Sequence, residues 1–566
     1  MSKGEDRKED PDAVHGRNDS SGMLVQAGIL AAAGIVVRII GLLYRSPLTG
    51  IIGDEGNGYY NYAYNCYVVI LLISAYSIPS AISKVIAERL ALGETRNAQR
   101  IFHGALCYVL LVSGAFSLFV FFEAKLLTFG HSVTVLRVFS PTILLFGFLG
   151  VLRGFFQARR TMVPTSISQI LEQIVNAAVS LAAAWLFIRG AGAGAGETEK
   201  AVRGAVGSAL GTGAGVLAAL LFMVVVYFRS RREIVSQMEK DEDRNPEPVR
   251  NIMKLLFVTV TPFILSTFIY NFSTMLDQTI FQRILIHVRH YTEQNTAIAY
   301  GIFSTKAVVI ANIPIALANA LSSAMMPNLS ASYARRDLDE TGSIVSRALH
   351  CTMIISVPCA AGLVALAKPV MMLLFPQRSS LDQAAALLAG IAVTVVFYSI
   401  STVTNAVLQA IGKMNLPVYN ALTALLVQGA VLALLLLFTG LDNRALVIAT
   451  ILYSALMCLL NHRAMSSRLR VSIDLRRFFG APFAASLVMA VMSRLVYGGT
   501  SFLLGRLLTP RGYLMNLLAL LPALFVAVLL YSLLLIRLHG VTREELMQMP
   551  KGAALVRLLE KIRILQ

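Results

Sequence analysis

The sequence predicts an all-α polytopic membrane protein of about 14 transmembrane helices, in two parallel six-helix bundles plus two C-terminal helices. Of its 566 residues, 56% are apolar and 14% are charged, with a mean hydropathy of +0.68. Soluble domains carry about 25% charged residues. Apolar runs of about 20 residues, the length that crosses a bilayer, recur along the chain. The charges gather in the segments between these runs, which is typical of a membrane protein.

Each of these apolar runs predicts one transmembrane span, with boundaries set by charged residues, Gly and Pro. In chain order the predicted spans are 23–45, 59–83, 101–122, 133–157, 165–189, 203–228, 255–281, 297–325, 345–367, 385–410, 416–439, 444–462, 480–502 and 513–537.

Basic residues are distributed unevenly between alternate loops. With the N-terminus inside, roughly 33 of the 49 Lys and Arg residues fall on the inner side and roughly 13 on the outer side. This bias places both termini in the cytoplasm. It also accounts for the net charge of +18 without a nucleic-acid partner.

Composition shifts divide the chain into six regions. A polar, disordered cytoplasmic tail is predicted first, and a charged linker with two prolines separates the two bundles. Apolar residues at helical spacing near the C-terminus, mixed with Lys and Arg, predict a helix on the inner membrane surface. The regions are the tail 1–22, the N-terminal bundle 23–228, the linker 229–254, the C-terminal bundle 255–462, two extra spans 463–537 and the surface helix 538–566.

Two cytoplasmic turns resemble each other. The segments QARRTMVP at 157–164 and QAIGKMNLP at 409–417 each place Gln-Ala, a basic turn and Met before a Pro that opens the next helix. They lie six predicted spans apart, so the two copies share one orientation in the membrane. Chance similarity of two short turns is the alternative. A true repeat predicts two bundles related by an axis along the membrane normal, with substrate bound at their interface and alternating access by rocking.

The first predicted span contains Arg38, and Arg45 follows at its end. A charge at the centre of a spanning helix costs roughly 2.5–3.5 kcal/mol, unless it lines a watery cavity or meets an anion. Arg45 at the interface and Arg38 paired with a buried acid are the alternatives. Small residues share the helical face of the two arginines. The face comprises Ala27, Ala31, Gly34, Arg38, Gly41 and Arg45.

Other predicted spans carry polar stripes that lipid does not tolerate, so they face partners or water. Interhelical hydrogen bonds of about 0.6 kcal/mol each are the alternative explanation for single Asn and Thr residues. Together the stripes predict a hydrophilic central cavity, which the arginines make cationic. Arginine binds phosphate oxygens bidentately, so the predicted ligand has a phosphate or pyrophosphate head. The candidate substrate-binding residues are Arg38, Arg45, Asn61, Asn65, Glu172, Asn176, Asn271, Asp277, Lys306 and Asn312.

The buried acids leave two interpretations open. Glu172 and Asp277 hold a coupling cation (sodium or a proton), or they pair with Arg38 and Lys306 when the cavity is empty. Membrane potential alone is the other predicted driving force.

Motifs for an enzyme are absent from the sequence. It has no Walker-type glycine loop, no His-Glu-x-x-His zinc spacing and no paired aspartates suited to magnesium pyrophosphate. We therefore expect no catalytic residue, no metal site and no cofactor.

Five short motifs carry a family resemblance. They are GLLYR at 41–45, IPSAISK at 78–84, RGFFQ at 153–157, MVPT at 162–165 and SQILEQ at 168–173. Together they resemble the stage V sporulation protein B (SpoVB) group of the multidrug/oligosaccharidyl-lipid/polysaccharide (MOP) exporter superfamily, which is related to MurJ-type lipid II flippases. The resemblance covers roughly residues 24–540.

This resemblance implies a two-bundle flippase for a polyprenyl-pyrophosphate-linked saccharide, with lipid II as the expected cargo. It implies that Arg38 and Arg45 hold the pyrophosphate and that the last two spans hold the polyprenyl tail. The second half departs from MurJ relatives, with Asp277 and Lys306 where those place a further arginine. Expected partners are the lipid-linked oligosaccharide, membrane lipids and cell-wall synthesis proteins. The alternatives are a cation-coupled multidrug exporter of the same superfamily and a flippase for another cell-surface polysaccharide.

Overall fold

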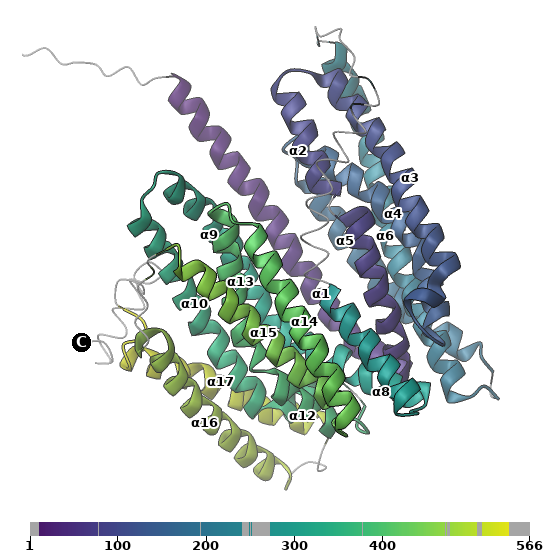
Figure 1. Cartoon of the computed structure of the whole chain (residues 1–566), viewed down its shortest axis with the longest axis vertical. Helices are drawn as coiled ribbons and strands as arrows, with labels where there is room; N and C mark the ends of the chain where they lie inside the picture. Colours follow the sequence, from purple (N-terminus) through teal and green to yellow (C-terminus); the bar gives the residue numbers. More distant parts are fainter. Residues whose placement is uncertain are drawn as a thin grey trace, which may run out of the picture. The chain divides into compact units, whose positions relative to one another are not determined.

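The structure is a computed structural model that falls into two compact units, 1–272 and 273–566 (Figure 1). Within its described residues every regular element is helical. The described residues are 11–76, 78–192, 194–239, 241, 248, 251, 272–375, 377–469, 471, 476–506 and 512–542. Predictions for 1–10, most of the linker after Asp241, Asn271 and the surface helix beyond Thr542 lie outside them.

The first unit consists of long helices. Their bounds are α1 Pro11–Leu71, the π-helix η1 Leu72–Tyr76, α2 Ile78–Ala91, α3 Thr95–Leu127, α4 Ser132–Ala158, α5 Val163–Arg189 and α6 Glu197–Glu239. Helix α1 begins inside the predicted tail, continues through the first predicted span and ends inside the second, whose remainder falls in η1 and α2. Gly53 interrupts it with a φ of 71°, a conformation that favours glycine, so α1 is two helices joined at a break.

Helices α5 and α6 pack most closely in this unit. Gly207, Gly211 and Gly215 form a stripe on α6 at a spacing of four residues. A Cβ at Gly211 would lie 2.5 Å from the backbone nitrogen of Ser180, and one at Gly215 would lie 2.5 Å from the carbonyl oxygen of Glu172. Small residues at this spacing let two helix backbones approach in a membrane. The stripe therefore fixes the position of α5 and of the polar residues it carries.

The second unit holds shorter helices (Figure 1). A helical segment at 272–283 leads into η2 Ile284–Val288. The others are α8 Glu293–Gly301, η3 Ile302–Val308, α9 Val309–Ala334, α10 Leu338–Ala365, α11 Ala367–Leu374, α12 Leu381–Ile391, α13 Thr394–Ala410, α14 Asn415–Phe438, α15 Asn443–Ser466, η4 Arg476–Gly480, α16 Ala481–Leu504 and α17 Tyr513–Arg537.

The last two helices, α16 and α17, pack on each other, and α16 packs on α10. Pro358 lies inside α10 and has no N–H to donate to the Ile354 carbonyl one turn earlier. The Tyr531 hydroxyl on α17 donates to that carbonyl at 2.7 Å. The side chain of Asn516 on α17 donates to the Pro369 carbonyl at 3.0 Å. Pro358 thus leaves the Ile354 carbonyl of α10 without a helical donor, and this carbonyl accepts the hydrogen bond that holds α17 to α10.

The two similar turns of the sequence share one backbone geometry. Arg160 and Gly412 occupy matching positions and have φ of 59° and 76°. In each turn the following N–H bonds back to a carbonyl five residues earlier, which is a Schellman ending. These bonds join Thr161 N to Phe156 O at 3.1 Å and Lys413 N to Leu408 O at 2.9 Å. The same ending follows α9, where Arg336 has φ of 61° and Asp337 N bonds to Ser332 O at 3.1 Å. The shared geometry is therefore a common helix C-terminus, and the repeat stays a prediction.

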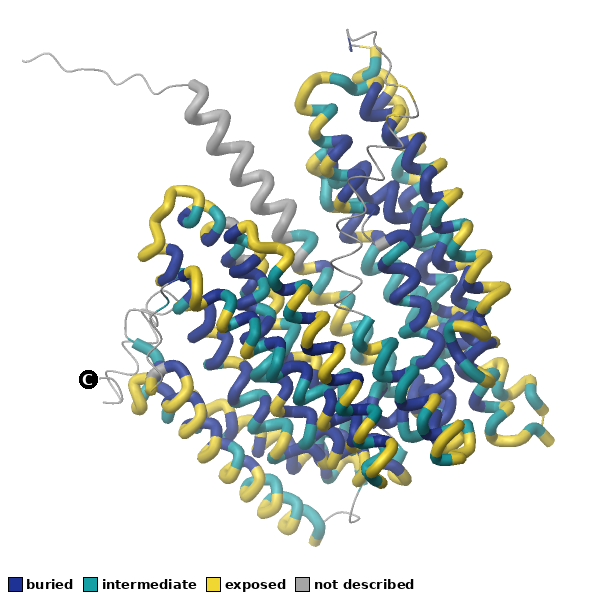
Figure 2. Tube along the Cα trace, in the orientation of Figure 1, coloured by how far each residue is buried: buried dark blue, intermediate teal, exposed yellow. Residues whose placement is uncertain are grey.

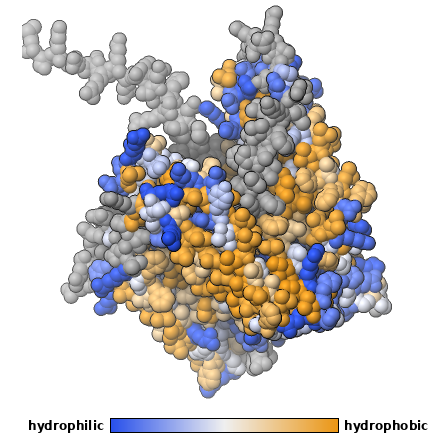
Figure 3. Space-filling view, viewed as in Figure 1, coloured by the Kyte–Doolittle hydropathy of each residue, from blue (hydrophilic) through white to orange (hydrophobic). Residues whose placement is uncertain are grey.

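Long apolar side chains remain exposed on the outer faces of both units (Figures 2 and 3). Leu43, Phe438 and Phe525 have exposed fractions of 66%, 79% and 69%. Exposed apolar surface on this scale indicates contact with lipid or another partner. The described residues contain 11 helices long and apolar enough to cross a membrane, or 12 if the bent pair of α12 and α13 counts as one span.

This confirms a polytopic all-α membrane protein, while the number fourteen is not confirmed. Two predicted spans run together in the apolar stretch Ala32–Ala91, and most of the span predicted at 255–281 lies outside the described residues.

Candidate functional site

The two predicted arginines of α1 lie in different surroundings. Arg38 is exposed and Arg45 is half-buried. The Arg45 guanidinium hydrogen-bonds with Tyr44 and lies within electrostatic range of the Tyr60 and Tyr64 hydroxyls. No described carboxylate lies within ion-pairing distance of either arginine. Arg45 is therefore a cation surrounded by phenols, with its charge available to an anion.

An aromatic cluster continues from Arg45 along the second part of α1. Tyr60 and Tyr64 stack with ring centroids 5.6 Å apart, and Tyr64 lies 6.0 Å from Tyr67. Phe139 of α4 contacts all three and stacks on Tyr67 at 4.8 Å. Tyr60 and Tyr64 are half-buried, whereas Tyr67 is 3% exposed. The cluster has a buried side against α4 and a side that retains exposure.

Glu172 lies beyond the other end of this cluster, close enough to interact electrostatically with Tyr67. Its Oε2 accepts from Arg153 Nη2 at 2.8 Å, and the side chains of Arg153 and Glu172 are 8% and 24% exposed. Arg153 Nε also donates to Ser168 Oγ at 2.9 Å. Glu172 thus pairs with Arg153 and not with Arg38. Of its two carboxylate oxygens, Oε2 makes the ion pair and Oε1 accepts no hydrogen bond from a described residue.

Close helix packing sets the position of this ion pair. On α4, a Cβ at Gly154 would lie 2.7 Å from the Pro79 carbonyl of α2, so that face of α4 lies directly on α2. On α5, the glycine stripe of α6 holds the backbone at Glu172. Arg153 is not among the site residues that the sequence predicts. The available signal was an arginine inside the apolar run at 133–157, in the RGFFQ motif.

Two of the predicted asparagines of the first unit make hydrogen bonds within their own helices. Asn61 Nδ2 donates to the carbonyl of Asn57 at 2.8 Å. Asn176 Oδ1 accepts from Ser180 Oγ at 3.0 Å, at the contact with α6. Asn65 is half-buried on the same stretch of α1 as the aromatic cluster. The first unit therefore brings together Arg45, the tyrosines and the Arg153–Glu172 pair, while Asn176 faces the helix contact.

The candidate substrate-binding residues of the second unit have separate surroundings. Asp277 Oδ2 accepts from Gln428 Nε2 of α14, whereas Asp277 Oδ1 and Gln428 Oε1 are buried without a hydrogen-bond partner among the described residues. Lys306 lies in η3, is 1% exposed and donates from Nζ to Ser380 Oγ at 2.7 Å. Asn312 is exposed on α9. Asp277 does not pair with Lys306 in the structure.

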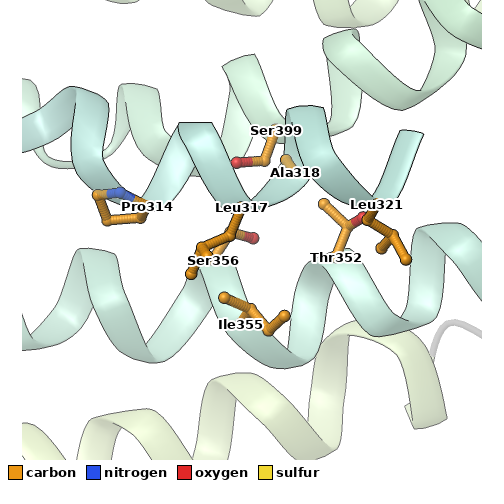
Figure 4. A pocket seen from close by; sticks show the side chains of 8 residues that line it. All are labelled: Pro314, Leu317, Ala318, Leu321, Thr352, Ile355, Ser356 and Ser399. Carbon is orange, nitrogen blue, oxygen red and sulfur yellow. The ribbon is translucent and has the colours of Figure 1, made fainter. Parts of the chain in front are cut away.

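A small pocket in the second unit lies between α9, α10 and α13 (Figure 4). Apolar side chains and three hydroxyl residues line it, with Leu317 and Ile355 beside Thr352, Ser356 and Ser399. It contains no charged residue and none of the predicted site residues, so it offers nothing to a phosphate.

Two protein-family models match this chain. A family model described as polysaccharide biosynthesis protein matches residues 24–333, which is more than half of the chain. The chain belongs to the polysaccharide biosynthesis protein family. A second model, MatE, matches residues 262–435.

Two curated relatives of this polysaccharide biosynthesis family member come from Bacillus subtilis (strain 168). Lipid II flippase MurJ is 25% identical over 440 residues, covering 74% of this chain and 77% of that protein. Stage V sporulation protein B is 24% identical over 528 residues, covering 92% and 96%.

Solved structures show the same fold. An inward-facing multidrug resistance MATE transporter of the MOP superfamily has a TM-score of 0.61 at 16% identity, covering 79% of this chain and 98% of that chain. Lipid II flippase MurJ in an inward closed conformation has a TM-score of 0.61 at 14% identity, covering 89% and 98%. These findings confirm the resemblance to the MOP superfamily. This family member is a multi-pass membrane transporter and not an enzyme.

Proposed function

We propose that this transporter is a flippase that moves a polyprenyl-pyrophosphate-linked saccharide, with lipid II as the cargo, across a bacterial cytoplasmic membrane by alternating access. The observation that carries the proposal is Arg45, a half-buried guanidinium that hydrogen-bonds with Tyr44, lies within electrostatic range of Tyr60 and Tyr64, and pairs with no described carboxylate. A planar guanidinium keeps its charge and binds phosphate oxygens bidentately. The names and coverage of the two Bacillus subtilis relatives support the cargo class.

In this proposal the site residues have distinct roles. Arg45 and the exposed Arg38 hold the pyrophosphate from α1. Lys306 would be a second cationic contact only after its Nζ leaves Ser380, because it is buried in the described state. The linker 229–254 carries the rocking motion, and both termini stay in the cytoplasm. Cell-wall synthesis proteins are the proposed protein partners.

Asp277 is the proposed coupling group. Asp277 Oδ1 is buried and accepts no hydrogen bond from a described residue. The same is true of Oε1, the amide oxygen of its partner Gln428. Unpartnered buried acceptors are costly, and a proton or sodium ion between them would relieve that cost. Glu172 is less suited to bind a cation, because Arg153 already balances its charge.

The proposed cargo is tested in cells depleted of their own lipid II flippase. Lipid II exposed at the outer leaflet is measured with and without expression of this protein. Restored exposure supports the proposal. Absent restoration, with the protein folded and in the membrane, refutes lipid II as cargo and leaves another polyprenyl-linked polysaccharide.

A cation-coupled multidrug exporter is the second candidate, favoured by the MatE match over residues 262–435. Export of amphipathic drugs driven by a sodium or proton gradient would support it. The unpaired arginines of α1 argue against it, because cationic drugs would be repelled there.

A further inference from the structure

We infer that the first unit carries a saccharide subsite formed by Tyr60, Tyr64 and Glu172, with Arg153 as the residue that positions Glu172. This inference rests on the proposed function, because it assigns the part of the cargo next to the pyrophosphate. All of its residues come from α1, α4 and α5 of one unit.

The Arg153–Glu172 ion pair determines which kind of ligand can bind beside it. Arg153 and Glu172 approach to 2.8 Å, so together they carry no net charge. The pair therefore favours neither a cation nor an anion as ligand. Glu172 is nevertheless 24% exposed, and its Oε1 remains an acceptor. A carboxylate oxygen only accepts hydrogen bonds. The suitable ligand is a neutral group rich in donors, such as the hydroxyls and acetamido N–H of a sugar.

The aromatic cluster supplies the second half of a sugar site. A sugar ring presents apolar C–H groups on its faces and hydroxyls at its edge, and aromatic rings offer a flat apolar surface. Tyr60 and Tyr64 stack at 5.6 Å and retain exposure, while Phe139 supports them from α4. The cluster is thus a preformed platform whose phenol edges can also hydrogen-bond.

The order of the groups matches the order of the cargo. Arg45 lies in range of Tyr60 and Tyr64, Tyr64 contacts Tyr67, and Tyr67 lies in range of Glu172. A pyrophosphate bound at Arg45 would lay the attached sugar over the tyrosines and turn its hydroxyls toward Glu172. Arg153 acts here as a positioning residue, because it fixes the carboxylate and cancels the charge that would repel the pyrophosphate.

The test compares two lipids that differ only in the sugar. Full-length protein in nanodiscs is titrated with undecaprenyl pyrophosphate and with the same lipid carrying an uncharged disaccharide. The readout is the ratio of the two dissociation constants. This ratio removes any general effect of charge on binding of the pyrophosphate.

We expect the wild-type protein to bind the saccharide-bearing lipid about tenfold more tightly. Glu172→Gln and Tyr64→Leu should each bring the ratio close to one. Glu233→Gln removes an exposed carboxylate on α6 and should leave the ratio unchanged. If Tyr64→Leu or Glu172→Gln does not fold, the double variant Arg153→Gln with Glu172→Gln carries the test, because it replaces the ion pair by two neutral amides and leaves no charge unpaired.

A wild-type ratio of one, or an unchanged ratio in Glu172→Gln, would overturn the saccharide subsite and leave the flippase proposal standing. Failure of the wild-type protein to bind either lipid would instead overturn the flippase proposal itself, and the subsite with it.

Discussion

Breaking the ion pair of the first unit should destabilise that unit strongly. Arg153→Gln leaves the Glu172 carboxylate without its cation and removes the donor to Ser168. Removing one partner of a buried ion pair costs about 3–5 kcal/mol, because a charge is left unpaired. Arg153 is 8% exposed, but Glu172 is 24% exposed and regains some water. We therefore expect the low end, about 3 kcal/mol of unfolding free energy.

A double variant distinguishes two costs of Arg153→Gln, the loss of the contact and the unpaired charge left on Glu172. Arg153→Gln with Glu172→Gln replaces the ion pair by two neutral amides that can still hydrogen-bond. It should be about 2 kcal/mol more stable than Arg153→Gln alone, because it leaves no charge unpaired. Arg137→Gln is the matched control, since Arg137 lies on the same helix and makes an exposed bond to the Phe121 carbonyl. It should cost less than about 1 kcal/mol.

The chain provides its own probe for this measurement. Trp185 is the single tryptophan, and it lies on α5, the helix that carries Glu172. Unfolding by SDS titration in mixed micelles, followed by Trp185 fluorescence, therefore reports on the affected helix. An Arg153→Gln protein as stable as the Arg137→Gln control would refute the reasoning. So would a double variant less stable than Arg153→Gln.

Three further outcomes follow from the packing and the charges. Arg38→Ala should reduce lipid translocation about tenfold or more while the protein still inserts; retained complementation of a flippase-depleted strain would contradict its role. Gly211→Leu should cost several kcal/mol, because even a Cβ there would lie 2.5 Å from the α5 backbone; Gly499→Ala, with open space around it, is the control in the same SDS titration. Tyr531→Phe should cost about 1 kcal/mol through its lost bond to the Ile354 carbonyl, and it fails as a prediction if the unfolding midpoint stays at the wild-type value.

The positions of most helices could be predicted from the sequence, because a segment that crosses the membrane is recognised by its length and its apolar residues. The spans predicted at 133–157 and 165–189 became α4, Ser132–Ala158, and α5, Val163–Arg189. The turn between them was set by its basic residues and the Pro at the start of α5. The break at Gly53 lies in a predicted loop instead. The stretch GDEGNG at 53–58 is rich in glycine and charge, which is typical of a loop, and it gives no signal for two helices that join end to end.

The partners of the polar residues were harder to predict. Which helix faces meet depends on packing, and a periodic pattern gives only the face of one helix. One of the two interpretations open for Glu172 pairs it with Arg38. The close contact of Gly154 with α2 and of Gly215 with α5 brings Arg153 to it instead. Similarly, Asn61 faces a carbonyl of its own helix. A side chain that can bond to its own backbone looks the same in sequence as one that binds substrate.

The most direct test of the account is lipid II translocation by the purified protein in liposomes. Labelled lipid II is incorporated in both leaflets, and the fraction that an external quencher reaches is measured over time. Wild-type protein should raise this fraction above that of protein-free liposomes, and Arg45→Gln should hold it at the protein-free level. A wild-type protein that leaves the fraction unchanged, or an Arg45→Gln protein that matches the wild type, would contradict a flippase organised around the α1 guanidinium.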